Sequence, residues 1–177
     1  MHMENPENNN LEQFTNLQFL NFVLGFFGVQ FAWQLEIILA GPVTERLGAL
    51  PFVFGLIWLA APITGVLIQP LIGTISDKTY TKFGRRRPYL LAGAIFGSLA
   101  LWILPNSGKI IIFLNNYFSL NLPHWAPLVF AAITIWVIDT SLNISQGPYR
   151  ALISDSVPLE QHSIAHSYMS LAIGMLF

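Results

Sequence analysis

The chain has 177 residues, of which 54% are hydrophobic and 10% are charged, and its formal net charge is −1. Soluble domains carry about 25% charged residues, so this composition predicts a membrane protein, and the near-neutral charge argues against a nucleic-acid partner. The absence of cysteine excludes disulfides, thiol chemistry and cysteine-bound metals.

The predicted elements begin with a short tail, residues 1–16, which is rich in asparagine and glutamate and has no Lys or Arg. Because a secretory signal starts with basic residues, we expect a cytoplasmic tail instead. The long uncharged runs that follow match the roughly 20 apolar residues needed to cross a bilayer. Gly41-Pro42 is expected to end the first of them. The five predicted membrane helices span about 17–41, 52–75, 88–105, 126–149 and 160–177.

The basic residues set the expected orientation. Five of the eight Lys and Arg lie between Lys78 and Arg87, in the loop between the second and third predicted helices. Short loops rich in Lys and Arg stay in the cytoplasm. The N-terminus is then also cytoplasmic and the 106–125 loop lies outside. We expect a multi-pass integral protein of the cell membrane, in a bacterium the inner membrane.

Two carboxyl groups fall within predicted spans, Glu36 and Asp139. An ionised carboxylate in the bilayer costs roughly 2.5–3.5 kcal/mol, which makes both residues candidates for proton coupling. Asp139, Asn143, Gln146 and Arg150 are spaced four, three and four, so they form one polar stripe on the fourth helix. The stripe either lines a polar cavity or bonds neighbouring helices, and Arg150 either opposes Asp139 or extends to the inner surface.

The first predicted helix adds three candidates for a substrate cavity. Gln30 and Gln34 share a face, and Trp33 beside them either stacks on a sugar ring or belongs to an aromatic belt. Glu36 lies on a different face, toward another helix or the rim of the cavity. It is either functional or a packing residue that is protonated or hydrogen-bonded.

The basic loop also carries a motif that resembles the signature of major facilitator transporters between helices two and three. Its residues are Gly73, Asp77, Gly84, Arg85, Arg86 and Arg87. The long spacing from Asp77 to Gly84 is similar to the variant in sucrose–proton symporters and their bacterial relatives in the glycoside–pentoside–hexuronide group. "GVQFAWQLEIILAGP", "APITGVLIQPLIG" and "IDTSLNISQGPYRALISD" resemble the first, second and fourth helices of that group.

This resemblance implies an all-α membrane protein, a truncated N-terminal half of a twelve-helix transporter that binds substrate between its halves. It implies proton-coupled symport of a small sugar or glycoside, such as a disaccharide. The partners would be the sugar, protons, membrane lipid and the missing C-terminal half. The motif would latch the halves together, or would only fix the topology.

The alternatives are a non-transporting remnant or scaffold and a sodium-coupled glycoside carrier. We expect no enzyme activity, cofactor or metal, since no phosphate-binding loop, catalytic triad or metal-ligand spacing occurs. The chain alone is expected to be inactive, with its latch partners missing and with Glu36 and Asp139 facing lipid.

Overall fold

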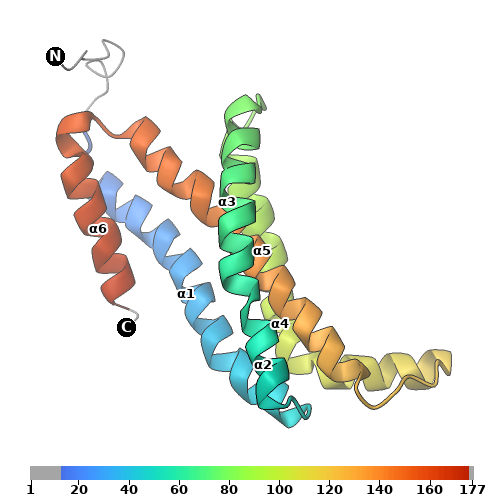
Figure 1. The fold of residues 1–177 in the computed structure, drawn as a ribbon. Helices are drawn as coiled ribbons and strands as arrows, with labels where there is room; N and C mark the ends of the chain where they lie inside the picture. The colour runs from blue at the N-terminus through green and yellow to red at the C-terminus, as the bar shows by residue number, and fades with distance from the viewer. Residues whose placement is uncertain (1–12, 176–177) are drawn as a thin grey trace.

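The computed structural model describes residues 13–175, so most of the predicted cytoplasmic tail lies outside the described residues, as do residues 176–177. The described part is helical and contains no strand, which confirms the predicted all-α class. Figure 1 shows the helices in chain order. They are α1 (Asn16–Arg46), α2 (Pro51–Trp58), α3 (Ala60–Lys78), α4 (Arg87–Phe118), α5 (Ala126–Ser156), the 3₁₀ turn η2 (Leu159–Gln161) and α6 (His162–Gly174).

Four segments of the described chain are long and apolar enough to cross a membrane. They are α1, α2 with α3, α4, and α5 as far as Ile153. The fifth predicted span corresponds to α6, which has 13 described residues. At 1.5 Å per residue that length covers about 20 Å, less than a bilayer core.

α1 begins at a capping box. The backbone N–H of Gln18 donates to the Thr15 hydroxyl, and the backbone N–H of Thr15 donates to the Gln18 side chain at 2.8 Å. The helix does not end at Gly41-Pro42 as predicted, because it continues through Pro42 to Arg46. Gly48, with φ of +85°, follows in a conformation that favours glycine.

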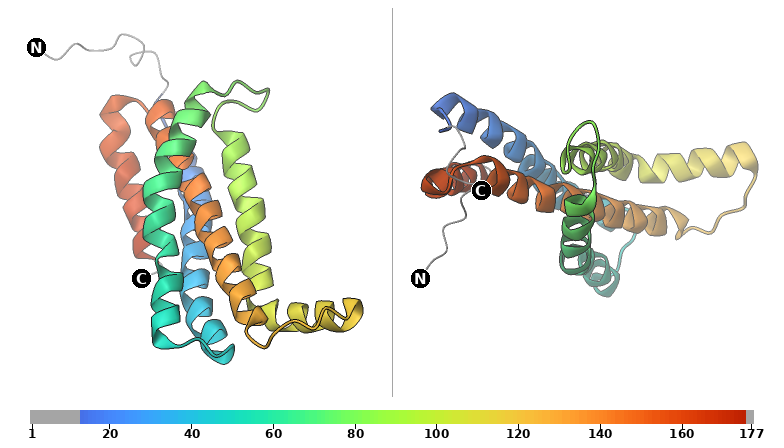
Figure 2. Two further views of the ribbon diagram at one scale, coloured as in Figure 1. Left: turned by 45° about the vertical axis from the view of Figure 1, so that its right-hand side comes forward. Right: turned by 90° about the horizontal axis from the view of Figure 1, so that it is seen from above.

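Prolines also shift the other boundaries. The second predicted helix is divided at Leu59, where Pro62 cannot donate to the carbonyl of Trp58. α4 continues past Pro105, its predicted end, to Phe118, and α5 runs through Pro148 to Ser156. In Figures 1 and 2 the last part of α4, drawn yellow, turns away from the bundle. At that bend the Asn106 side chain donates to the carbonyl of Trp102 at 2.9 Å.

α5 is the central helix, packed against α1, α3 and α4 (Figure 2). Its C-terminal end joins α1 and α6 in one apolar cluster that includes Phe26, Tyr149 and Met169. Its other end joins α1, α2 and α4 in a second cluster that includes Leu104 and Ile138. The outward surface is apolar too, as lipid contact requires; its exposed side chains include Leu24, Val66, Ile95, Phe113 and Ile133.

Candidate functional site

The two predicted carboxyl residues meet inside the helix bundle. Glu36 on α1 is 4% exposed and Asp139 on α5 is 3% exposed, and their side chains are within hydrogen-bonding reach of each other. An ionised carboxylate can only accept hydrogen bonds. A hydrogen bond between the two groups therefore requires that one of them carries a proton.

The described helices enclose this pair. Both residues line a cavity of about 10 Å³ together with Trp33, Trp58 and the apolar side chains Ile37, Ala40, Ala61 and Ile135. The expectation that Glu36 and Asp139 face lipid in this chain is therefore wrong, because α1, α2, α3 and α5 cover them. Glu36 lies on a different face from Gln34 and points toward another helix, which is one of the two predicted possibilities.

The polar stripe on α5 is bonded to α1 and α3. The Gln69 side-chain amide of α3 donates to Asn143 at 2.6 Å and to Gln146 at 2.9 Å. Asn143 donates in turn to the Thr64 hydroxyl at 3.0 Å, and Gln146 to Gln30 at 3.4 Å. These contacts correspond to the alternative in which the stripe bonds neighbouring helices, so the role of its members as substrate ligands stays a prediction.

Arg150 lies apart from the carboxyl pair. It is exposed on the C-terminal part of α5, 11 residues beyond Asp139, or about 16 Å along a helix. Glu36 is within hydrogen-bonding reach of Asp139. As the expected counter-charge of Asp139, Arg150 would therefore have to act from a distance. On α1, Trp33 Nε1 and Gln34 Nε2 are buried without a hydrogen-bond partner in the described part of the chain.

The arginine motif forms ion pairs within this chain. Arg86 is 9% exposed and contacts Asp77 at 3.1 Å and Asp155 at 2.8 Å, while Arg85 contacts Asp155 at 3.4 Å. Gly84, with φ of +93°, turns the chain into this arrangement. Arg85 and Arg86 thus have an acidic partner within this chain, because the end of α5 supplies Asp155, while the expectation that the latch partners in the other half are missing stays a prediction.

Gly73 of the motif makes no close contact between helices within the described structure. A Cβ atom built there would meet nothing within 4 Å. The close approach occurs instead at Gly93 of α4, where a Cβ atom would overlap the Ser145 side chain and the carbonyl of Ser141. Arg87 is exposed at the first position of α4.

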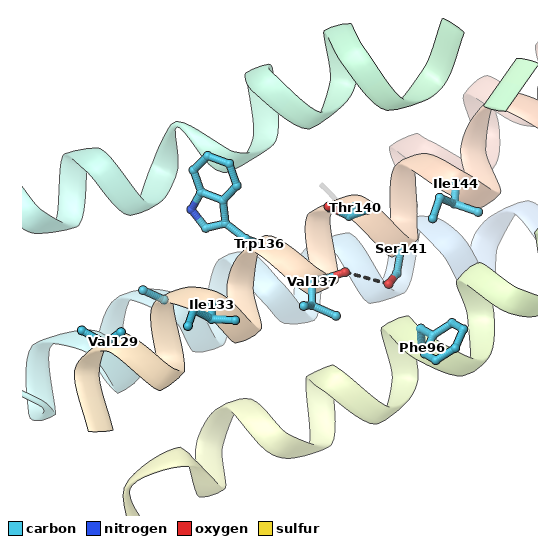
Figure 3. A pocket seen from close by; sticks show the side chains of 9 residues that line it. Phe96, Val129, Ile133, Trp136, Val137, Thr140, Ser141 and Ile144 are labelled. Carbon is cyan, nitrogen blue, oxygen red and sulfur yellow. Dashed lines mark hydrogen bonds between the residues drawn. The ribbon is translucent and has the colours of Figure 1, made fainter. Parts of the chain in front are cut away.

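A larger groove of about 630 Å³ lies along α5 beside Phe96 of α4 (Figure 3). Its walls are mainly apolar, with Val129, Ile133, Trp136, Val137 and Ile144 among them. The hydroxyl of Ser141 is already used, because it donates to the carbonyl of Val137 at 2.6 Å. A sugar site needs several polar groups that converge on the ligand, so this groove is not the predicted substrate cavity.

Residues 21–168 match a family model described as "MFS/sugar transport protein". The chain belongs to this family of major facilitator transporters. A general alpha-glucoside permease of Schizosaccharomyces pombe is 31% identical over 161 residues, which cover 91% of this chain and 29% of that protein. A sucrose transport protein of Arabidopsis thaliana is 36% identical over 153 residues, 83% of this chain and 26% of that protein. No solved structure matches the chain.

This major facilitator chain is a multi-pass integral membrane protein, and it spans less than a third of the length of these relatives. The matched region contains all the predicted site residues. Sequence reasoning missed Thr64, Gln69 and Asp155. The available signals were a single amide side chain in the predominantly apolar second span and an acidic residue at the C-terminal end of the fourth.

Proposed function

We propose that this chain is part of a proton-coupled secondary transporter of a small sugar or glycoside, with the Glu36–Asp139 pair as the proton site. The family and the sucrose and alpha-glucoside specificity stated in the names of its relatives support the substrate class. Sucrose and alpha-glucosides are both glycosides, so we propose a disaccharide as the substrate. The observation that carries proton coupling is the burial of two carboxyl groups within hydrogen-bonding reach of each other.

The pair can bind a proton tightly for an electrostatic reason. With one proton, the two groups carry a single negative charge. Without it, both groups are negative and repel each other; two unit charges about 4 Å apart repel by about 4 kcal/mol at an effective dielectric constant of 20. Release of the proton therefore requires a change in the surroundings, such as entry of water or movement of α1 relative to α5. Alternating access between two conformations supplies such a change.

The orientation proposed for this transporter has a cytoplasmic N-terminus. The Arg86 ion pairs with Asp77 and Asp155 then hold the cytoplasmic ends of α3, α4 and α5 together. Substrate binding between two halves requires helices beyond those described here. Gln30, Trp33, Gln34, Asn143, Gln146 and Arg150 remain the residues proposed for the substrate side of this half.

The test of coupling uses a chimera in which residues 21–168 replace the matching segment of the S. pombe alpha-glucoside permease. We expect Asp139→Asn and Glu36→Gln each to abolish accumulation of labelled sugar driven by a proton gradient. Exchange of sugar across the membrane at equal pH should persist. Glu45→Gln is the matched control, since Glu45 lies on the same helix but is exposed. Accumulation by the Asp139→Asn chimera would show that this carboxyl group is structural, and accumulation driven by sodium would favour a sodium carrier.

A further inference from the structure

The cavity beside the carboxyl pair is small and bounded by polar as well as apolar side chains. Its volume is about 10 Å³, and its lining includes Trp33 and Glu36 from α1, Trp58 from the end of α2, and Asp139 from α5. Trp58 is not among the residues proposed for the substrate side, and Trp33, which is among them, also shares this cavity wall with Glu36.

Four buried polar atoms belong to these lining residues and have no hydrogen-bond partner in the described part of the chain. They are Glu36 Oε2, Asp139 Oδ1, Trp33 Nε1 and Trp58 Nε1. The indole nitrogens can only donate hydrogen bonds, and the carboxylate oxygens accept them. The residues around the cavity thus offer two donors and two acceptors, whereas buried polar groups in proteins are almost always hydrogen-bonded.

The small volume of the cavity, with two donors and two acceptors around it, determines which ligand can bind there. A water molecule needs about 10–15 Å³ of such space and two to four polar partners, and it can donate two hydrogen bonds and accept two. A sodium ion would use the carboxylate oxygens, but the positive ends of two indole N–H groups would oppose it. A sugar is far too large for the cavity.

We propose that the cavity binds one water molecule, which donates to Glu36 and Asp139 and accepts from the indole N–H groups of Trp33 and Trp58. Trp33 and Trp58 are then positioning residues that act on the carboxyl pair through this water. The importance of the water for transport rests on the proposed function, whereas the binding site rests on the geometry of the four side chains alone. The bound water would also be a third group, beside the two carboxyl groups, that can accept or deliver a proton.

Infrared spectroscopy of the purified 177-residue chain in lipid vesicles tests the binding site without any transport. We expect the wild-type chain to show an O–H stretching band of a hydrogen-bonded internal water, at lower frequency than a free O–H, which shifts when H₂¹⁸O replaces ordinary water. The band should be lost or displaced in Trp33→Phe and Trp58→Phe, because each variant removes one donor and keeps an aromatic ring. Trp102→Phe is the matched control, since Trp102 is 65% exposed on the outer surface.

The wild-type spectrum decides the outcome even where a variant does not fold. The absence of an ¹⁸O-sensitive internal band in the wild-type chain would overturn the proposal, because the cavity would then be dry. A band that moves with sodium but not with choline would overturn it in favour of a cation. An unchanged band in both Trp33→Phe and Trp58→Phe would also contradict it. None of these results depends on proton coupling, which the chimera tests separately.

Discussion

The packing of α4 on α5 gives a stability test with a matched control one turn away. In Gly93→Ala the new methyl group would overlap the carbonyl of Ser141 and the hydroxyl of Ser145, and would lie 3.1 Å from the backbone nitrogen of Ser145. A backbone neighbour cannot rotate aside as a side-chain end can, so α4 and α5 must separate. In Gly97→Ala the nearest atoms are at 3.5 and 3.7 Å, which is ordinary contact.

The two variants are therefore expected to change stability in opposite directions. Overpacking costs about 1–3 kcal/mol, and loss of the bond from the Ser145 hydroxyl to the carbonyl of Leu90 adds about 1 kcal/mol. Alanine in place of glycine stabilises the helix by about 1 kcal/mol, because alanine has the higher helix propensity. Gly93→Ala should thus lose about 1–3 kcal/mol and Gly97→Ala should gain up to about 1 kcal/mol.

The measurement is the free energy of unfolding of the purified chain in detergent micelles, followed by circular dichroism as SDS is added. The comparison between the two variants removes effects of detergent and of helix propensity that they share. A Gly93→Ala chain as stable as Gly97→Ala would refute the reasoning, because α4 and α5 would not then approach each other closely at Gly93.

Three further predictions concern the loops and the chain as a unit. Arg86→Gln should lower the free energy of unfolding by about 1 kcal/mol, and by less in high salt, because both aspartates are over a third exposed. The control Arg87→Gln should change the free energy of unfolding little. Equal losses in the two variants would contradict the ion-pair arrangement. An impermeant thiol reagent on whole cells should label Asn116→Cys but not Tyr80→Cys, and the reverse pattern would invert the topology. The purified chain alone should show no counterflow of labelled disaccharide above empty vesicles.

The membrane helices could be predicted from the sequence because long uncharged runs are a strong signal, but their ends could not. The first predicted helix ends at Gly41-Pro42, since proline lacks an N–H and crowds the preceding turn, whereas α1 continues through Pro42 to Arg46. Membrane helices tolerate proline because neighbouring hydroxyl and amide side chains can satisfy carbonyl groups near it. Near Pro42 the Thr44 hydroxyl donates to the carbonyls of Ala40 at 2.7 Å and Gly41 at 3.1 Å, although the carbonyl that loses its N–H donor at Pro42 is that of Ile38.

The candidate site was predictable along each helix but not between helices. Spacing alone placed Asp139, Asn143 and Gln146 on one face of α5, because that depends only on the helical repeat. Their partner Gln69 and the meeting of Glu36 with Asp139 depend on how α1, α3 and α5 cross. A single sequence contains no local record of those crossings, so it placed Arg150 at the end of the stripe as a counter-charge for Asp139 but did not reveal that Glu36 lies within reach of Asp139.

The position of the carboxyl pair constrains how coupling would work. The pair is buried inside this half, so a sugar bound between two halves would not reach it directly. Asn143 joins the two regions, because its side chain donates to the backbone carbonyl of Asp139 at 2.9 Å and to Thr64 of α3 at 3.0 Å. Gln69 continues the connection to Gln146, which reaches Gln30 of α1. On the proposed function, release of the proton separates Glu36 from Asp139, and this amide network passes the resulting movement of α1 and α5 to the substrate side.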